Sequence, residues 1–199
     1  MKTGRVTTLF LAIILTPSVG AATVPRQNPA PSQSKGCLAK GETPAEGLLA
    51  AAARGDMAAV KNMLDNRANV NLQDGGGRTA LFFAADRGRT EIVKMLLARG
   101  ADAKTAAGAK ALSAAACAGD LESVKAILGK GADINAQDKE GVTALMVAAE
   151  ENRVEVVKLL LTRGANASLK DEDGETALDY AEFEEHKEVI EILKRAKKK

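Results

Sequence analysis

The hydrophobic residues of this chain recur at helical spacing in short segments, most clearly in residues 138–170. There one segment aligns Leu145, Ala148 and Ala149, and the next aligns Val156, Val157, Leu160 and Leu161. Thr143 is placed to cap the first helix, Asn152 and Arg153 to make the turn, and Gly164 to end the second helix. The pattern predicts two helices of fewer than about ten residues, which must stack on neighbours because helices this short do not persist alone in water.

The same frame recurs along the chain as Gly-x-Thr-Ala-Leu at 77–81, 141–145 and 174–178. The alanine-rich segment 104–120 belongs to the series too, because Gly108 lies 23 residues before a Gly-Ala-Asp, as Gly77 and Gly141 lie before Gly-Ala-Asp or Gly-Ala-Asn. Self-similarity of this kind predicts a repeat array, stacked closely through the small alanines. Five copies can be counted, at 44–73, 74–104, 105–137, 138–170 and 171–199.

The shared pattern resembles the ankyrin repeat: Asp-x-x-Gly-x-Thr-Ala-Leu, paired alanines, a Val-Val-Lys-x-Leu-Leu segment and Gly-Ala-Asp. The resemblance covers roughly 44–197 and implies an all-α solenoid of about five helix–turn–helix repeats with short inter-repeat hairpins. Alanine stands where the family commonly has proline after the threonine. The terminal copies depart further, with Glu46 in place of the capping threonine and Glu185 in place of the turn glycine.

Copy three is unusual in two ways. Gly100 and Gly108 are 8 residues apart, against 10 for Gly131–Gly141 and Gly164–Gly174, so its hairpin should be two residues shorter. Lys110 also replaces the capping threonine, at an expected cost of roughly 1 kcal/mol of local stability. Together these features predict a dip in the middle of the concave face.

The N-terminus has the features of an export signal. Lys2 and Arg5 precede the apolar run Leu9–Leu15, and small residues follow up to Ala22. The run is shorter than the roughly 20 residues of a membrane span, so we expect residues 1–22 to be cleaved, leaving a periplasmic or secreted protein with no membrane attachment. Residues 23–43, with three prolines, are expected to form a flexible tether before the repeat domain 44–199.

Charge argues against a nucleic-acid partner. Loss of the two signal cations leaves 28 − 2 = 26 Lys and Arg against 26 Asp and Glu, so the mature protein is formally neutral. The basic cluster 194–199 fits a solvated tail.

Catalytic equipment is sparse. The single histidine, His186, falls on an inter-helix turn, where the ankyrin pattern itself often places histidine, and one histidine with two distant cysteines supplies no usual metal site. Gly75–Gly77 lacks the Lys-Ser/Thr of a phosphate-binding loop and suits a hairpin tip. We therefore expect no enzyme activity, no metal and no cofactor.

The two cysteines raise one alternative. Cys37 lies in the tether and Cys117 at the end of the first helix of copy three. The seven or so residues from Cys37 to the first copy span roughly 23–25 Å, so a disulfide between them is within reach in an oxidising compartment. Two free or transiently paired thiols are the other reading.

Ankyrin-type proteins commonly bind partners through hairpin tips and first-helix ends, which line one concave side. In this chain these positions hold Arg78, Asp86, Arg87, Ala109, Cys117, Ala118, Lys139, Glu140, Val142, Glu150, Glu151, Asp173, Glu175, Phe183 and Glu184. The strip is mixed at one end, bare in the middle and acidic toward the C-terminus; an ordinary solvated face is the alternative reading. Phe183 is expected either to anchor a partner or to cover the core end, and Phe82 and Phe83 to pack inside.

The resemblance implies a non-enzymatic protein-binding module, monomeric alone, that grips one protein partner. Exported bacterial ankyrin proteins of this size include inhibitors that protect a cell from an enzyme such as a cell-wall peptidase or a toxin. Others are maintenance or assembly factors for envelope enzymes such as catalase. The two functions differ in whether the activity of the partner falls or rises on binding.

Overall fold

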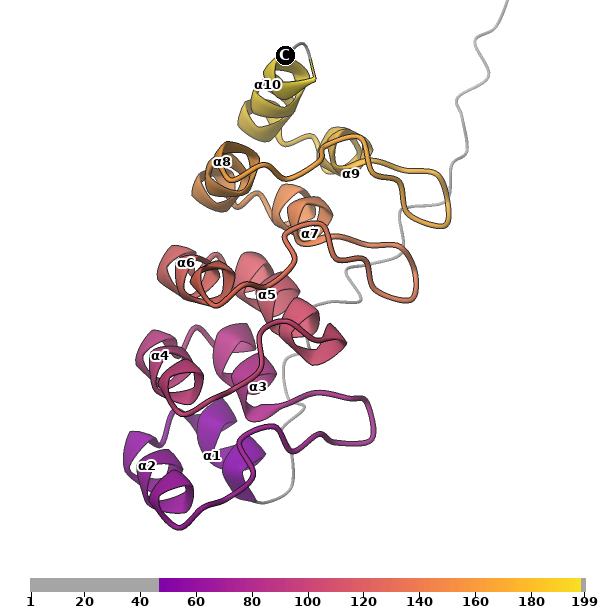
Figure 1. Cartoon of the computed structure of the whole chain (residues 1–199). Coiled ribbons are helices and arrows are strands. Elements are labelled where there is room, and N and C mark those ends of the chain that lie inside the picture. The colour runs from indigo at the N-terminus through magenta and orange to yellow at the C-terminus, as the bar shows by residue number, and fades with distance from the viewer. Residues whose placement is uncertain (1–46, 198–199) are drawn as a thin grey trace, which may run out of the picture.

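The computed structural model describes residues 47–197, which form ten helices (Figure 1). They are α1 (Gly47–Arg54), α2 (Met57–Asp65), α3 (Ala80–Asp86), α4 (Thr90–Ala98), α5 (Ala106–Ala118), α6 (Leu121–Gly129), α7 (Ala144–Glu150), α8 (Val154–Thr162), α9 (Ala177–Phe183) and α10 (Lys187–Ala196). The predicted signal 1–22, the tether 23–43, Cys37 and Glu46 lie outside the described residues, so the statements about them stay predictions.

The helices stack as two columns. The odd-numbered inner helices form one column and the even-numbered outer helices the other, and the loops that lead into α3, α7 and α9 project beyond the inner column (Figure 1). Within residues 47–197 the β structure is limited to an isolated antiparallel bridge between Gln137 and Thr143. The predicted all-α solenoid of five helix pairs is confirmed.

The core runs the length of the array, and its composition explains the stacking. The paired alanines of three inner helices are fully buried: Ala84, Ala85, Ala115, Ala116, Ala148 and Ala149. Side chains this small let consecutive inner helices approach closely. Each outer helix buries one face only, since Val157 and Leu160 are inside while Glu155 and Lys158 are exposed and pair at 2.8 Å.

The predicted helix boundaries of copy four are confirmed. The Thr143 hydroxyl accepts a hydrogen bond from the backbone N–H of Met146 at 3.3 Å, and Gly164 takes a left-handed φ of 90° after α8. The turn between the paired helices also needs a left-handed residue. Asn152 (φ 54°) and Glu185 (φ 57°) fill that position in copies four and five, so Glu185 adopts a conformation that glycine would adopt at lower energy.

Copy three differs from the prediction at its first helix. Helix α5 has 13 residues, whereas α3, α7 and α9 have 7 each, and its N-cap is Thr105. The predicted helix start at Lys110 is therefore wrong, because Lys110 lies inside the helix; the N-cap Thr105 makes no side-chain capping hydrogen bond. No full-length hairpin forms at 102–108, as predicted from its short length, and Figure 1 shows the resulting gap in the row of projecting loops.

Copy three also joins copy two through Asp120, the N-cap of α6. Its carboxylate accepts hydrogen bonds from the Ser123 backbone N–H at 3.1 Å and from the Thr90 hydroxyl at 2.7 Å. Burial raises the pKa of Asp120, but these hydrogen bonds to the ionised form outweigh it and hold the pKa below its ordinary value of 3.8. Asp120 thus stabilises a helix end and an inter-repeat contact together.

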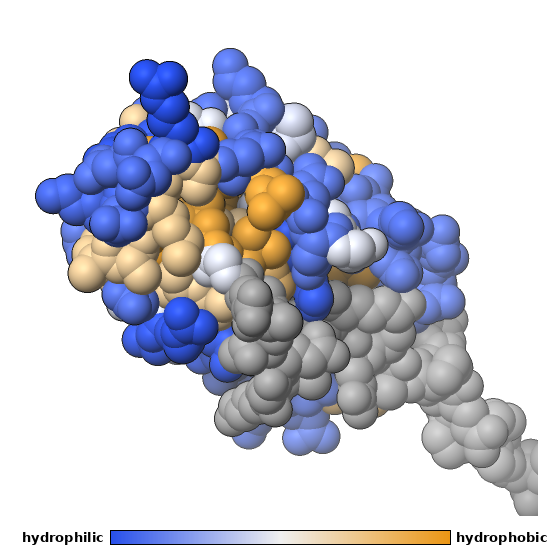
Figure 2. Space-filling model, turned by 90° about the horizontal axis from the view of Figure 1, so that it is seen from below, coloured by the Kyte–Doolittle hydropathy of each residue, from blue (hydrophilic) through white to orange (hydrophobic). Residues whose placement is uncertain are grey.

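The N-terminal end of the array is less polar than its sides. Seen from this end, apolar side chains gather in the middle of the face with hydrophilic ones around them (Figure 2). Met57, Met63 and Leu64 of α2 are only partly buried. Among the described helices, none combines the length and hydropathy needed to cross a membrane.

Candidate protein-binding surface

Three hairpin loops, 74–78, 138–142 and 171–175, share one construction. The first residue is an aspartate whose Oδ1 accepts the backbone N–H groups two and four residues later, at 2.8–3.1 Å in every loop. A backbone hydrogen bond from the aspartate N–H to the carbonyl four residues on closes each loop. The aspartates Asp74, Asp138 and Asp171 therefore fix the direction in which the tips project.

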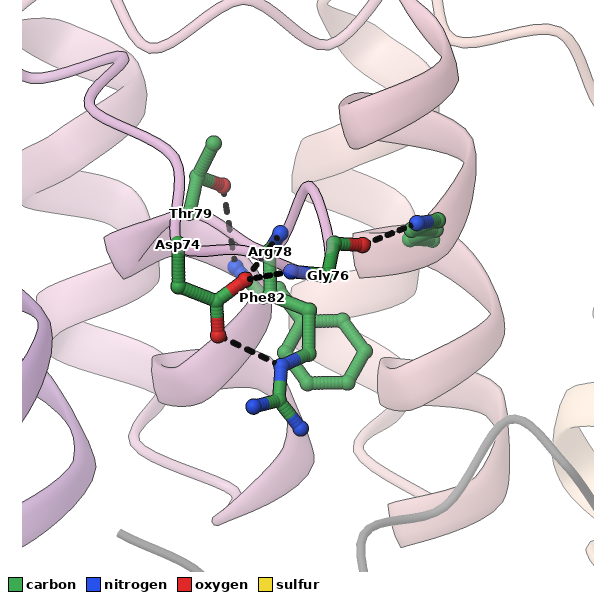
Figure 3. Close-up of polar contacts among 6 residues, drawn as sticks. Asp74, Gly76, Arg78, Thr79 and Phe82 are labelled. Atoms are coloured by element: carbon green, nitrogen blue, oxygen red, sulfur yellow. Dashed lines mark hydrogen bonds and ion pairs between the residues drawn. The ribbon is translucent and has the colours of Figure 1, made fainter. Parts of the chain in front are cut away.

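The first loop makes polar contacts both within itself and with α5 (Figure 3). The Arg78 guanidinium donates to the Asp74 carboxylate at 2.7 Å and lies 5.1 Å from the Phe83 ring centroid, and Lys110 donates to the Gly76 carbonyl at 2.5 Å. Partial burial raises the pKa of Asp74, but the hydrogen bonds from Arg78 and Gly76 lower it by more, so the pKa lies below its ordinary value. These contacts join the tip to α3 and α5.

Copy three has no such loop, for a local reason. Thr105 stands where the other copies have the aspartate, its hydroxyl makes no capping hydrogen bond, and two residues are missing. Ala106 and Ala107, both strong helix formers, follow directly. The chain enters the helix at this point, and Lys110 reaches back from α5 to the neighbouring loop.

The second part of the surface is the row of inner-helix ends. Asp86, Cys117, Glu150 and Phe183 occupy equivalent places at the ends of α3, α5, α7 and α9. Each of the last two helix pairs makes a polar contact with the inner-helix end of the pair before it. Arg153 Nε donates to the Cys117 carbonyl at 2.7 Å, and His186 Nε2 lies 2.8 Å from the Glu150 carbonyl. His186 is also the N-cap of α10, which fits the structural role expected from its place on the turn.

The structure places the predicted site residues on these loops and helix ends, with unequal exposure. Lys139, Asp173, Phe183 and Glu184 are exposed; Arg78, Asp86, Arg87, Ala109, Ala118, Glu140, Glu150, Glu151 and Glu175 are half-buried; Cys117 and Val142 are buried. Phe183, at 48 % exposure, is one of two large exposed apolar side chains within 47–197, whereas Phe82 and Phe83 pack inside as predicted. Together these residues form what we call the concave strip.

The strip has a charge gradient. At its N-terminal end it holds Arg78 and Arg87, and Arg87 pairs with Asp86 at 3.2 Å. At its C-terminal end it holds only acidic charges apart from Lys139, namely Glu140, Glu150, Glu151, Asp173, Glu175 and Glu184. A partner surface complementary to this end is basic.

Of the predicted cysteine pair, the structure describes one member. Cys117 is disulfide-bonded and 8 % exposed. Cys37 lies outside the described residues, so its pairing with Cys117 stays a prediction.

The described residues offer little for chemistry. Between Gly47 and Lys197 no three His, Cys, Asp or Glu side chains are grouped so that they could hold a metal ion. The most perturbed group is Tyr180, where burial and the hydrogen bond that its hydroxyl donates to Asp171 at 2.8 Å both raise the pKa. That shift keeps the phenol protonated and structural.

Sequence reasoning missed one row of buried residues that lies beside the helix ends. Phe83, Ala114, Val147 and Tyr180 lie three residues before Asp86, Cys117, Glu150 and Phe183, on the same side of each inner helix. Counting back three residues from the helix ends would have found them. They form an apolar row beside the row of helix ends.

The family assignment follows from a comparison with known protein families. The family model described as ankyrin repeats (3 copies) matches residues 48–138 and 112–199. This chain therefore belongs to the ankyrin-repeat family. Ankyrin repeats form protein–protein interaction modules and are generally not enzymes.

Proposed function

We propose that this chain is an exported ankyrin protein that binds one protein partner through the concave strip and inhibits it, protecting the cell from an enzyme such as a cell-wall peptidase or toxin. The observation that carries the proposal is the acidic half of the strip, where half-buried Glu150 and Glu151 adjoin exposed Phe183. An apolar anchor surrounded by charge of one sign is an arrangement that suits capture of a basic protein surface.

Export is the part of the proposal that comes from residues 1–22. Envelope fractionation of cells, with the mature N-terminus determined by mass spectrometry, tests it. Cleavage after Ala21 or Ala22 supports export, and an uncleaved protein in the cytoplasmic fraction contradicts it.

Binding is tested with charge variants. Affinity capture from an envelope extract with Glu150→Lys/Glu151→Lys should lose the partner that the wild-type protein retains. The matched control is Glu122→Lys/Glu155→Lys, with the same charge change on exposed positions of the outer helices α6 and α8. Equal retention by both variants, each with a native circular dichroism spectrum, would sink the assignment of the strip.

A maintenance or assembly factor for an envelope enzyme such as catalase is the second candidate. The same acidic strip could serve it, because a binding surface does not determine the effect on the bound enzyme. Assaying the captured enzyme with and without purified protein separates the two functions: a fall in activity supports inhibition, and a rise supports maintenance.

A further inference from the structure

The apolar row beside the concave strip is more deeply buried than its described neighbours explain. Phe83, Ala114, Val147 and Tyr180 are each 1 % exposed or less. An inner helix such as α7 packs against α5, α9 and α8, on three sides. Its six residues from Ala144 to Ala149 point in every direction around the helix axis, yet all are buried, so the fourth, concave side is covered as well.

Polar contacts point to the same face. Eight residues make a contact in addition to those described above: Arg78, Asp86, Arg87, Cys117, Glu140, Glu150, Glu151 and Glu175. All eight belong to the concave strip, and for Cys117 a disulfide accounts for it. A segment lying on the strip would account for these contacts and for the burial of the apolar row.

We propose that the occupant is the N-terminal segment of the same chain, residues 23–46, held along the strip by a disulfide between Cys37 and Cys117. Cys37 is the only other cysteine in the sequence, so a bond within one chain has no alternative partner. The inference concerns the free protein and does not depend on the proposed function.

Reach allows this path. From Cys37 to Gly47, where α1 begins, there are ten residues, which extend to roughly 33–36 Å. Neighbouring packed helices are about 8–10 Å apart, so α1 and α5 are separated by roughly 16–20 Å across two steps. The extended segment is thus longer than this separation, and the extra length lets it cross the strip obliquely, from the end of α5 to the start of α1.

Charge sets the direction. Arg26 and Lys35 precede Cys37, and no acidic residue lies between 23 and 37. If Cys37 sits at copy three and Gly47 starts copy one, the part before Cys37 continues toward copies four and five, where Glu150 and Glu151 lie. The part after Cys37 carries Glu42 and Glu46 over the N-terminal end of the strip, where Arg78 and Arg87 lie. Lys40 is the one charge outside this complementarity.

The bond makes the coverage redox-dependent. Oxidation joins the two Sγ atoms, releases two protons and passes two electrons to a disulfide oxidant, which becomes a dithiol. A dithiol reductant reverses the exchange and leaves two thiols. A protein partner of the strip must then displace residues 23–46, which is easier once the bond is broken.

Limited trypsin digestion tests the proposal on protein that retains residues 23–199, with cleavage after Arg26, Lys35 and Lys40 followed by mass spectrometry. In the oxidised protein we expect these bonds to be cut at least about tenfold more slowly than in Cys37→Ser. Cleavage in the lysine-rich tail 197–199 is the internal reference and should not differ. Non-reducing peptide mapping should recover a Cys37–Cys117 linked pair.

Two charge variants separate docking of the segment from the disulfide alone. Glu150→Lys/Glu151→Lys in the oxidised protein should speed cleavage after Arg26 and Lys35, and Glu122→Lys/Glu155→Lys on the outer helices should not. Free thiols, a disulfide-linked dimer, or equal cleavage rates in the oxidised protein and Cys37→Ser would overturn the proposal. Partner capture is not measured here, so failure of this proposal leaves the proposed function standing, and the reverse also holds.

Discussion

Gly108 explains how α5 can extend beyond the length of the other inner helices, and its replacement by alanine provides a sharp test. Gly108 is buried within α5, where the helix passes over the backbone of Ala103. A Cβ at this position would lie 2.2 Å from the Ala103 carbonyl oxygen, 2.3 Å from its carbonyl carbon and 2.5 Å from its Cα. These are backbone atoms, so no change of rotamer relieves the overlap.

Two effects of opposite sign set the magnitude. Alanine is favoured over glycine in a helix interior by about 1 kcal/mol. Overpacking of a close backbone contact costs typically 1–3 kcal/mol, and contacts this short put Gly108 at the upper end of that range. We expect Gly108→Ala to lower the free energy of unfolding by roughly 1–2 kcal/mol.

Gly129→Ala is the matched control. Gly129 is also helical, at the end of α6, but it is exposed and a Cβ there meets nothing within 4 Å. Only the propensity effect applies, so this variant should be stabilised by up to about 1 kcal/mol. Urea unfolding followed by circular dichroism measures both. If Gly108→Ala is also stabilised, the close approach of α5 to Ala103 is wrong.

The remaining predictions concern three single side chains. Asp120→Asn should lower the free energy of unfolding measured in urea at pH 7. Because the folded-state pKa of Asp120 is below 3.8, the stabilisation by its carboxylate is full above about pH 5, and the difference from wild type should shrink as pH falls through the folded-state pKa. A difference that does not depend on pH would contradict the role of the ionised carboxylate. Tyr180→Phe removes the hydrogen bond to Asp171 and should cost about 1 kcal/mol by the same assay; a neutral result would mean that this bond does not hold loop 171–175. Phe183→Ala should change unfolding by no more than about 0.5 kcal/mol while reducing partner retention in affinity capture; a large loss of stability would instead show that Phe183 covers the core.

Much of the fold could be read from residues whose role is local. Thr143 caps a helix, Gly164 ends one, and Leu160 faces inward because of its spacing; each effect depends on neighbours within a few positions. The repeat then multiplies this local information, since every copy meets nearly the same environment. The repeat determines the backbone conformation even at Glu185, which is left-handed because it occupies the turn position of the repeat.

Copy three is where local reasoning failed. The frame placed Lys110 at a helix start, but a helix start depends on what the preceding residues do. With threonine at 105 instead of aspartate and with two residues fewer, the chain forms helix earlier, and only glycine at 108 allows that helix to pass Ala103. The missing aspartate was visible in the sequence, whereas the close contact with Ala103 was not.

The candidate site divides in the same way. The positions of its loop tips and helix ends could be predicted, because they recur with the repeat, and Phe183 is exposed at the end of α9. The burial of Cys117, Val142 and the apolar row could not, because burial depends on contacts between segments that are distant in sequence.

The sequence by itself determined the ankyrin array, its register and the charge gradient along its concave strip, since periodicity, capping and composition act over short distances. Only the tertiary structure decided that α5 is extended, that Lys110 joins the neighbouring loop at Gly76, and that the apolar row of the inner helices is buried. The physical reason is that these features depend on contacts between segments distant in sequence, whose distances a one-dimensional pattern does not contain.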